Sequence, residues 1–313
     1  EKKTIPNAML IYGNRGIGKI AHAIEFSAAI LCKKPIDNFA CSECKSCKKI
    51  KTNQHENINF ILPISFKKKI SKGKSILDSL SNEEIDDFKK KIKQKATNPY
   101  FDVSDKKVQS ISINAIREIR KDISLSSLNN SWKIHIIIDS EKLCYPRQEA
   151  ANALLKMLEE PHEKNLFILC TSNISQIIDT ISSRCFKFYF SNLSNKSIEL
   201  YLIKTYKTSQ KKAEIISNIS SGNMILANQI NNIYEILLKD FNKIINVILQ
   251  NKINEWINFV SKFPNKNYSF ILILELLELF FLDIIILDKT GQEQRIKFKI
   301  FINEMNRYIY KYK

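Results

Sequence analysis

Residues 13–19 constrain the fold of this chain more than any other part of its sequence. They read GNRGIGK, follow an apolar run that ends at Tyr12, and precede apolar residues at helical spacing. The pattern G-x-x-x-x-G-K is typical of a loop whose backbone N–H groups approach phosphate oxygens at the positive end of a helix, with a lysine that reaches the terminal phosphates. The sequence therefore predicts a strand, a phosphate loop and a helix, with four loop residues facing a nucleotide: Gly13, Gly16, Gly18 and Lys19.

The groups that would hold magnesium and orient water are incomplete. Ile20 follows the loop lysine, where a Ser or Thr hydroxyl would bind Mg²⁺. A β-branched strand over residues 133–138 ends at Asp139, where nucleotide-binding folds hold this ion. Active ATPases of this kind place a glutamate next, but here Ser140 follows, and Glu141 is expected on the opposite face of the strand. We predict a degenerate site that includes Asp139, binds ATP or ADP weakly or not at all, and lacks the usual Mg²⁺ ligands.

Four of the seven cysteines lie close together in a C-x8-C-x2-C-x2-C pattern. Gaps of two residues let thiolates turn onto a common centre, and four thiolates complete a tetrahedral Zn²⁺ shell with no open position. No cleavable signal pattern opens the chain, so we expect a cytoplasmic protein whose clustered thiols are metal ligands rather than disulfides. The predicted structural zinc ligands are Cys32, Cys41, Cys44 and Cys47.

The charge balance leaves two explanations open. The chain of 313 residues has 49 Lys and Arg against 32 Asp and Glu, a formal net charge of +17. A polyanionic partner is one explanation, and a general bias of the composition toward Lys, Asn and Ile is the other. The charged insertion over residues 67–107 is open in the same way, because its lysine runs suit either phosphates or a solvated surface. We expect one helix in it, over residues 82–95.

Strands and helices alternate over residues 1–190. Apolar strands near residues 10, 58, 134, 167 and 188 predict a five-stranded parallel sheet of the α/β class. A further strand at residues 111–113 is expected to lead into an amphipathic helix that ends near Leu125. The helix over residues 149–160 ends at Pro161.

Strand signals stop after Ser191. Helical spacing predicts a small all-α domain over residues 191–230 and a second over residues 231–313. The apolar run over residues 270–287 contains Glu275, Glu278 and Asp283, so we interpret it as a buried helix rather than a membrane span. Its apolar stripes either pack against partner subunits or close a self-contained bundle.

Two further motifs add specificity to the phosphate loop and the four cysteines. They are ANALLKMLEEP at residues 151–161 and SSRC at residues 182–185. With these motifs the chain closely resembles the bacterial clamp-loader AAA+ subunits of DNA polymerase III. The resemblance covers nearly the whole chain and implies an AAA+ module (residues 1–190) with an inserted zinc site (residues 32–47), a helical lid (191–230) and a helical collar (231–313) that joins five subunits in a ring.

Three departures select between the two relevant kinds of member, the ATP-hydrolysing gamma/tau subunit and the non-hydrolysing delta-prime subunit. Ile20 lacks a hydroxyl, Ser140 replaces the catalytic acid, and Ile225 lies near the place of a phosphate-sensing arginine. These departures favour delta-prime. Two others are a short segment before the first strand and a lengthened turn at residues 145–148. The resemblance assigns Arg184 as a trans-acting arginine finger that enters the ATP site of a neighbouring subunit.

The resulting hypothesis is an ATPase-deficient stator that completes a neighbour's active site and helps load the sliding clamp at primed DNA. Its implied partners are the gamma/tau and delta subunits in a hetero-pentamer, the sliding clamp and primed DNA, with no membrane. Two alternatives remain: a gamma/tau-like motor that hydrolyses ATP despite Ile20, and a zinc-module nucleic-acid-binding protein whose phosphate loop is a relic of the fold.

Overall fold

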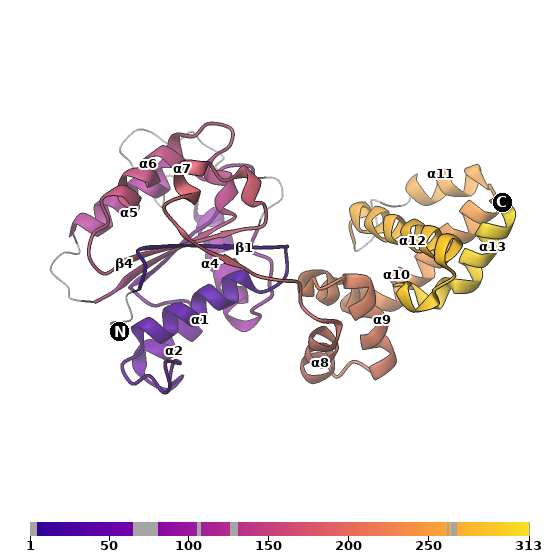
Figure 1. The fold of residues 1–313 in the computed structure, drawn as a ribbon, viewed down its shortest axis with the longest axis horizontal. Coiled ribbons are helices and arrows are strands. Elements are labelled where there is room, and N and C mark those ends of the chain that lie inside the picture. The colour runs from indigo at the N-terminus through magenta and orange to yellow at the C-terminus, as the bar shows by residue number, and fades with distance from the viewer. Residues whose placement is uncertain are drawn as a thin grey trace. The chain divides into compact units, whose positions relative to one another are not determined.

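The computed structural model describes residues 5–64, 81–104, 108–125, 131–261, 263 and 268–312 (Figure 1). The chain divides into two compact units, Glu1–Ser191 and Asn192–Lys313. Residues 67–80 and 105–107 of the predicted insertion lie outside the described ranges.

The first unit is built on a sheet of five parallel strands in the order β2-β3-β4-β1-β5. The interior strands β3 and β4 are buried along almost their whole length, as their continuous apolar sequences predict. The five-stranded parallel sheet expected from the sequence is confirmed. The strand bounds are β1 (Ala8–Tyr12), β2 (Ile58–Ile61), β3 (Lys133–Ile138), β4 (Asn165–Thr171) and β5 (Phe186–Tyr189).

Helices cover both faces of this sheet (Figure 1). Because side chains alternate along a strand, the apolar residues of each strand feed two separate cores. One core joins the sheet to α5 (Ile113–Leu125), α6 (Glu149–Glu159) and α7 (Asp179–Ser182). The other joins it to α1 (Lys19–Leu31), α2 (Lys45–Lys51) and α4 (Asn82–Thr97).

Two predicted elements can be compared closely with the structure. The predicted helix in the insertion is confirmed as α4, which begins with a capping box between Ser81 and Glu84. The prediction of a strand at residues 111–113 is wrong. The backbone N–H of Ile111 donates to the carbonyl of Lys142 (3.0 Å), and the Ser112 hydroxyl accepts the N–H of Asn114 (3.2 Å), so this apolar stretch forms the entry to α5.

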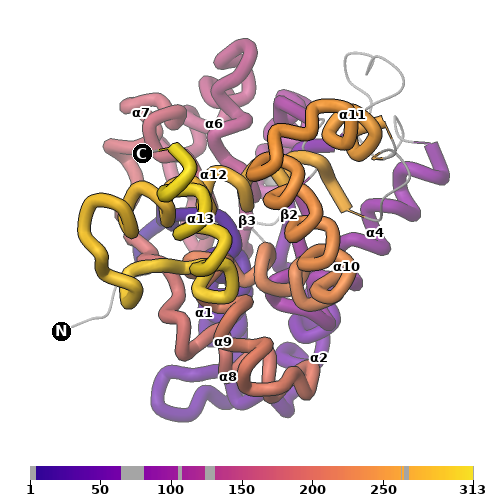
Figure 2. The backbone as a smooth tube through the Cα atoms, turned by 90° about the vertical axis from the view of Figure 1, so that its right-hand side faces the viewer, coloured from indigo at the N-terminus to yellow at the C-terminus, as the bar shows by residue number. Residues whose placement is uncertain are grey.

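The second unit consists of helices in its described part, as the loss of strand signals predicts. Phe241, Phe280, Phe298 and Phe301 form an aromatic core with ring centroids 5.4–6.3 Å apart, and the backbone course of α10, α12 and α13 can be followed in Figure 2. The bounds are α8 (Asn195–Tyr206), α9 (Gln210–Ser220), α10 (Met224–Leu249), α11 (Ile253–Ser261), α12 (Phe270–Thr290) and α13 (Ile302–Tyr312), with short 3-10 turns at Glu293–Arg295 and Lys299–Phe301.

The predicted boundary between residues 230 and 231 falls inside the continuous helix α10, so the division into lid and collar stays a prediction. In α12 the carboxylate of Asp283 is buried and accepts the backbone N–H groups of Lys297 (2.9 Å) and Phe298 (2.8 Å). An acidic group in this apolar helix is therefore satisfied by the chain itself. Within the described part of the chain, no helix combines the length and hydrophobicity that crossing a membrane requires.

Candidate functional site

The phosphate loop between β1 and α1 has the conformation that its glycines predict. Gly13, Gly16 and Gly18 all have positive φ angles (145°, 77° and 92°), and α1 begins directly afterwards. A Cβ atom on Gly13 would lie 2.2 Å from the carbonyl oxygen of Phe190, so only glycine fits there. The loop is therefore closely fitted to the end of β5.

Lys19 is turned back onto this loop. Its ammonium donates to the carbonyls of Gly13 (2.7 Å) and Asn14 (2.6 Å) and to the hydroxyl of Ser172 (3.1 Å). The residue is 7% exposed, and burial lowers the pKa of the ammonium below its usual value. Three acceptors use all three N–H donors of a lysine, so the group that should reach phosphates is satisfied by protein atoms.

A segment from the insertion packs on the outside of the loop. The guanidinium of Arg15 forms an ion pair with Asp102, and a ring carbon of Tyr100 lies 3.3 Å from where a Cβ of Gly18 would be. The buried ammonium of Lys95 donates to the carbonyls of Pro99 and Phe101 and fixes this segment. Sequence reasoning missed the contact because Arg15 and Asp102 are 87 residues apart and no local pattern joins them.

Ile20 packs at the margin of an apolar core cluster, so its side chain has a structural place there. Asp139 ends β3 in a left-handed conformation (φ 51°), and one carboxylate oxygen lies 3.4 Å from Nζ of Lys142. The hydroxyl of Ser140 is buried and has no hydrogen-bond partner among the described residues.

The expectation that Glu141 would point to the opposite face is wrong. The strand ends at Ile138, so the two-residue alternation no longer applies, and Glu141 lies in the 3-10 turn Ser140–Leu143. Its carboxylate accepts the hydroxyl of Thr171 (2.7 Å) and is near enough to Lys19 to oppose the lowering of the lysine pKa. An acidic group thus remains beside the loop, displaced from its expected position.

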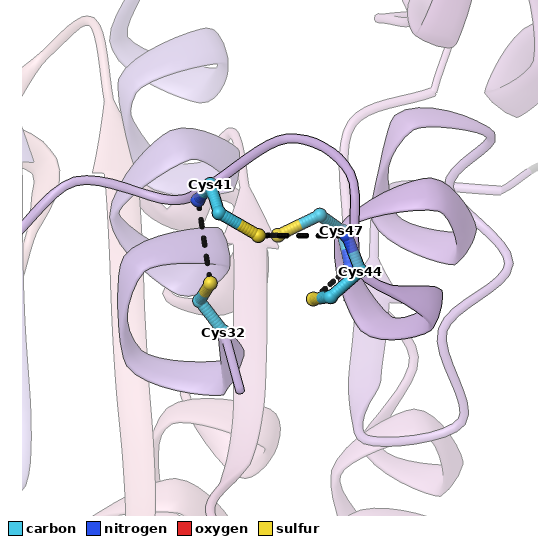
Figure 3. Close-up of side chains that lie close together, drawn as sticks. All are labelled: Cys32, Cys41, Cys44 and Cys47. Carbon is cyan, nitrogen blue, oxygen red and sulfur yellow. Dashed lines mark hydrogen bonds between the residues drawn. The ribbon is translucent and has the colours of Figure 1, made fainter. Parts of the chain in front are cut away.

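The four predicted metal ligands come together at the far end of α1 (Figure 3). Their Sγ atoms all lie within 4.8 Å of one another, and those of Cys41 and Cys47 are 4.0 Å apart. Four thiolates at about 2.3 Å from a tetrahedral Zn²⁺ would be about 3.8 Å apart, so the group needs only a small contraction to hold one ion.

Backbone N–H groups support the sulfur atoms. The N–H groups of Cys41, Cys44 and Cys47 donate in turn to the sulfurs of Cys32 (3.3 Å), Cys41 (3.4 Å) and Cys44 (3.5 Å). The donation from Cys47 is the main reason that the pKa of the Cys44 thiol falls to about 6, whereas burial raises the pKa of Cys47 to about 12. The four cysteines therefore can bind a metal ion, with thiolates that the fold partly prepares.

Arg184 lies on the surface, close in sequence to two buried residues. Ser182 and Cys185 are buried, while the Arg184 side chain is 37% exposed. Its guanidinium pairs with Glu159 at the end of α6 (2.8 Å) and donates to the carbonyl of Thr180 (2.8 Å). Two sequence motifs, LLKMLEEP and SSRC, thus meet through this pair and hold the arginine at an exposed edge of the sheet unit.

Comparison with known proteins decides the family. The family model described as "DNA polymerase III, delta subunit" matches residues 1–194, which is more than half of the chain. The chain belongs to this family. The resemblance inferred from the motifs is confirmed, with delta-prime and gamma/tau subunits as its relatives.

Individual relatives agree with this family. The DNA polymerase III subunit delta' of Bacillus subtilis (strain 168) is 25% identical over 224 residues, which cover 71% of this chain and 53% of that protein. The tau subunit of the same organism is 29% identical over 229 residues (71% of this chain, 32% of that protein). Subunit delta' of Buchnera aphidicola subsp. Schizaphis graminum is 28% identical over 221 residues (71% and 52%). The aligned part of the chain spans about half the length of these delta' relatives and a third of the tau relative.

Proposed function

We propose that this chain is a delta-prime-like subunit of a DNA polymerase III clamp loader that hydrolyses no ATP itself and lends Arg184 to a neighbouring ATPase subunit. The observation that carries the first half is Ile20, which follows the loop lysine and supplies no oxygen for Mg²⁺. The N–H donors of Lys19 bond to protein acceptors in the loop and at Ser172. In this proposal the phosphate loop serves to stabilise the sheet unit.

The second half of the proposal rests on the setting of Arg184. An arginine finger must project from a rigid support and carry hydrogen-bond donors to a phosphoryl group outside its own chain. The setting of Arg184 supports this role, because the buried Ser182 and Cys185 fix the backbone around it and Glu159 holds its guanidinium at the surface. On approach of a triphosphate, the phosphoryl oxygens would replace the carboxylate of Glu159 as the partner of the guanidinium.

In this role the cysteine module holds a structural Zn²⁺. Four thiolate ligands fill a tetrahedral shell, so such a site stabilises a fold and leaves no position for substrate. The other implied partners are the gamma/tau and delta subunits in a hetero-pentamer, the sliding clamp and primed DNA.

The test uses the loader reconstituted with Arg184→Ala, Arg184→Lys or the control Arg147→Ala. Arg147 is also a surface arginine, with an 83% exposed side chain and a distant carboxylate partner at 3.9 Å. A finger contributes about 10³–10⁵ in rate, so ATP turnover at the adjacent site should fall by about 10³-fold with Arg184→Ala and remain unchanged with Arg147→Ala. Undiminished DNA-stimulated turnover and clamp loading by the Arg184→Ala assembly would contradict the assignment.

A separate measurement distinguishes the stator from a gamma/tau-like motor. This second candidate is considered because the tau subunit of Bacillus subtilis is 29% identical to the aligned part of this chain. A stator shows no Mg²⁺-dependent ATP turnover as the isolated chain. Turnover that disappears with Lys19→Ala would instead identify a motor.

A further inference from the structure

The cysteine module displays two apolar side chains on a tight turn. The N–H of Ile36 donates to the carbonyl of Phe39 (3.0 Å), and the N–H of Phe39 donates to that of Ile36 (2.8 Å). Between them Asp37 and Asn38 both have positive φ angles (48° and 68°), the geometry of a two-residue type I′ hairpin turn. Ile36 and Phe39, called here the apolar pair, therefore face each other across the narrowest part of a hairpin.

The apolar pair is held outward. Ile36 is 64% exposed and Phe39 is 70% exposed. Two metal ligands, Cys32 and Cys41, lie on either side of the hairpin, so the cysteine cluster closes its base. Burying a large apolar side chain is worth about 1.5–3 kcal/mol, and this unit leaves that free energy unused at both positions. The pair contributes little to the fold that carries it.

An open hollow lies beside the hairpin. It has a volume of ≈ 350 Å³ and lies between α1, the cysteine module and the end of α4. Its wall is mainly apolar and includes Ala40, which directly follows Phe39 in the chain. A chain that contacts Phe39 can therefore place an apolar side chain in the hollow. The main apolar lining residues are Ala21, Ile24, Ala28, Ala40 and Ile50.

The charges around this surface have one predominant sign. Residues 32–51 contain six lysines and no arginine, with Asp37 and Glu43 as the acids. All six lysines are exposed, and within the described part of the chain only Lys49 has an acidic partner, Glu56 (2.9 Å). The six are Lys33, Lys34, Lys45, Lys48, Lys49 and Lys51.

We propose that the apolar pair, the adjacent hollow and these lysines form a docking surface for an extended acidic segment of a partner protein that carries apolar side chains. The charges select an acidic partner, and the apolar pair with the hollow selects one that can bury carbon. Nucleic acid fits less well, because only Phe39 of the apolar pair has an aromatic face on which a base can stack and the module has no arginine to form a bidentate contact. This inference does not depend on the role proposed for Arg184.

The test measures binding to the full chain loaded with Zn²⁺, by fluorescence anisotropy with three labelled probes. The first is a twelve-residue peptide in which Asp and Glu alternate with Leu and Phe. The second is the same peptide with Ser in place of Leu and Phe, and the third is a twelve-nucleotide oligo-dT. The first probe should bind at least about tenfold more tightly than either of the others.

Variants identify the surface. Ile36→Ser with Phe39→Ser should weaken binding of the first peptide by about tenfold or more, whereas the control Ile253→Ser with Ile257→Ser, an equally exposed apolar pair on α11, should leave it unchanged. Lys33→Gln with Lys34→Gln should weaken it and reduce its salt dependence. A metal content of one equivalent in each variant shows that the cysteine module is intact. If the Ile36→Ser, Phe39→Ser variant loses metal, the proposal is judged on the Lys33→Gln, Lys34→Gln variant.

Three results would overturn the proposal. They are no binding of the first peptide, binding that survives both the apolar and the lysine substitutions, and tighter binding of oligo-dT that depends on Phe39. The last result would assign the surface to single-stranded nucleic acid.

Discussion

The two ends of helix α1 carry the two strongest motifs in the chain, and they differ in how their polar groups are satisfied. At the N-terminal end, Lys19 is bonded to loop carbonyls, and Arg15 is paired with Asp102. At the C-terminal end, Cys32 joins three other cysteines whose sulfurs converge. The backbone N–H groups of Cys41, Cys44 and Cys47 donate to three of those sulfurs. The polar groups of the phosphate loop bond to one another and to neighbouring residues, whereas four converging thiols have the arrangement that a tetrahedral metal ion requires.

The largest expected effect is loss of the metal. Cys44→Ser with Cys47→Ser removes two of four thiolates, and structural zinc binding of this type contributes on the order of 10 kcal/mol. We expect metal content to fall from about one equivalent to below about 0.1, and amide exchange across residues 32–51 to become fast. Metal analysis and hydrogen exchange measure both. Cys144→Ser, outside the cluster, is the control, and full metal content in the double variant would contradict the comparison.

Gly13→Ala should produce the next largest effect, because it tests the phosphate loop as structure. A new Cβ would overlap the carbonyl of Phe190 and impose an unfavourable φ of 145° on alanine. We expect unfolding free energy to fall by about 4 kcal/mol, from overpacking and backbone strain together. Gly291→Ala separates these causes, since its φ is 64° and, apart from its chain neighbours, no described residue lies within 4 Å of its Cβ position. About 1–2 kcal/mol is expected there. If Gly13→Ala and Gly291→Ala lowered the unfolding free energy equally in thermal or denaturant unfolding, the phosphate loop would not be closely packed against Phe190.

Acid should act on the sheet interior through His135. Burial lowers the pKa of His135 from 6.5 to about 4, while the unfolded chain takes up its proton near 6.5. The stability present above pH 6.5 is therefore lost as pH falls toward 4, by at most about 3 kcal/mol at 1.36 kcal/mol for each pH unit. His55, whose pKa is also lowered by burial, acts in the same direction.

Thermal unfolding between pH 7 and 4 measures this effect, with His135→Asn as the comparison. The variant should have a flatter pH dependence. An identical slope in both proteins would contradict the role assigned to His135.

The smallest effect is expected for Lys19→Ala. The substitution removes hydrogen bonds to Gly13 and Asn14 and should cost about 1–2 kcal/mol of stability. In the assembled loader, ATP turnover and clamp loading should change by less than about twofold, since the ammonium serves the loop itself. Lys196→Ala, an exposed lysine at the start of α8, is the control. If Lys19→Ala alone abolished nucleotide binding or clamp loading, the phosphate loop at the N-terminal end of α1 would be a ligand site, and the comparison would be wrong.

Local patterns were enough to predict most of the framework. The buried strands, the glycine loop and the spacing of the four cysteines each depend on residues within about a dozen positions, and the structure confirms the five strands and the cysteine cluster. The hairpin turn at residues 36–39 also has a local sequence pattern, two turn-forming residues between two apolar ones. It was not predicted because the surrounding cysteines were read only as metal ligands.

The remainder depends on contacts that no local pattern encodes. Asp102 reaches Arg15 from 87 residues away, and Glu159 reaches Arg184 from a different motif. Glu141 was misplaced because the left-handed turn at Asp139 ends the alternation of β3, a backbone event that strand periodicity cannot represent.

Helix α10 has a mechanical consequence for the second unit. It runs without interruption for 26 residues, about 39 Å at 1.5 Å per residue, through the predicted border of lid and collar. A continuous helix transmits rotation from one end to the other and has no joint at which to dissipate it. Any tilt imposed on its first turn beside α9 is therefore carried as a displacement of its last turn beside α11, which makes α10 a rigid lever rather than a tether.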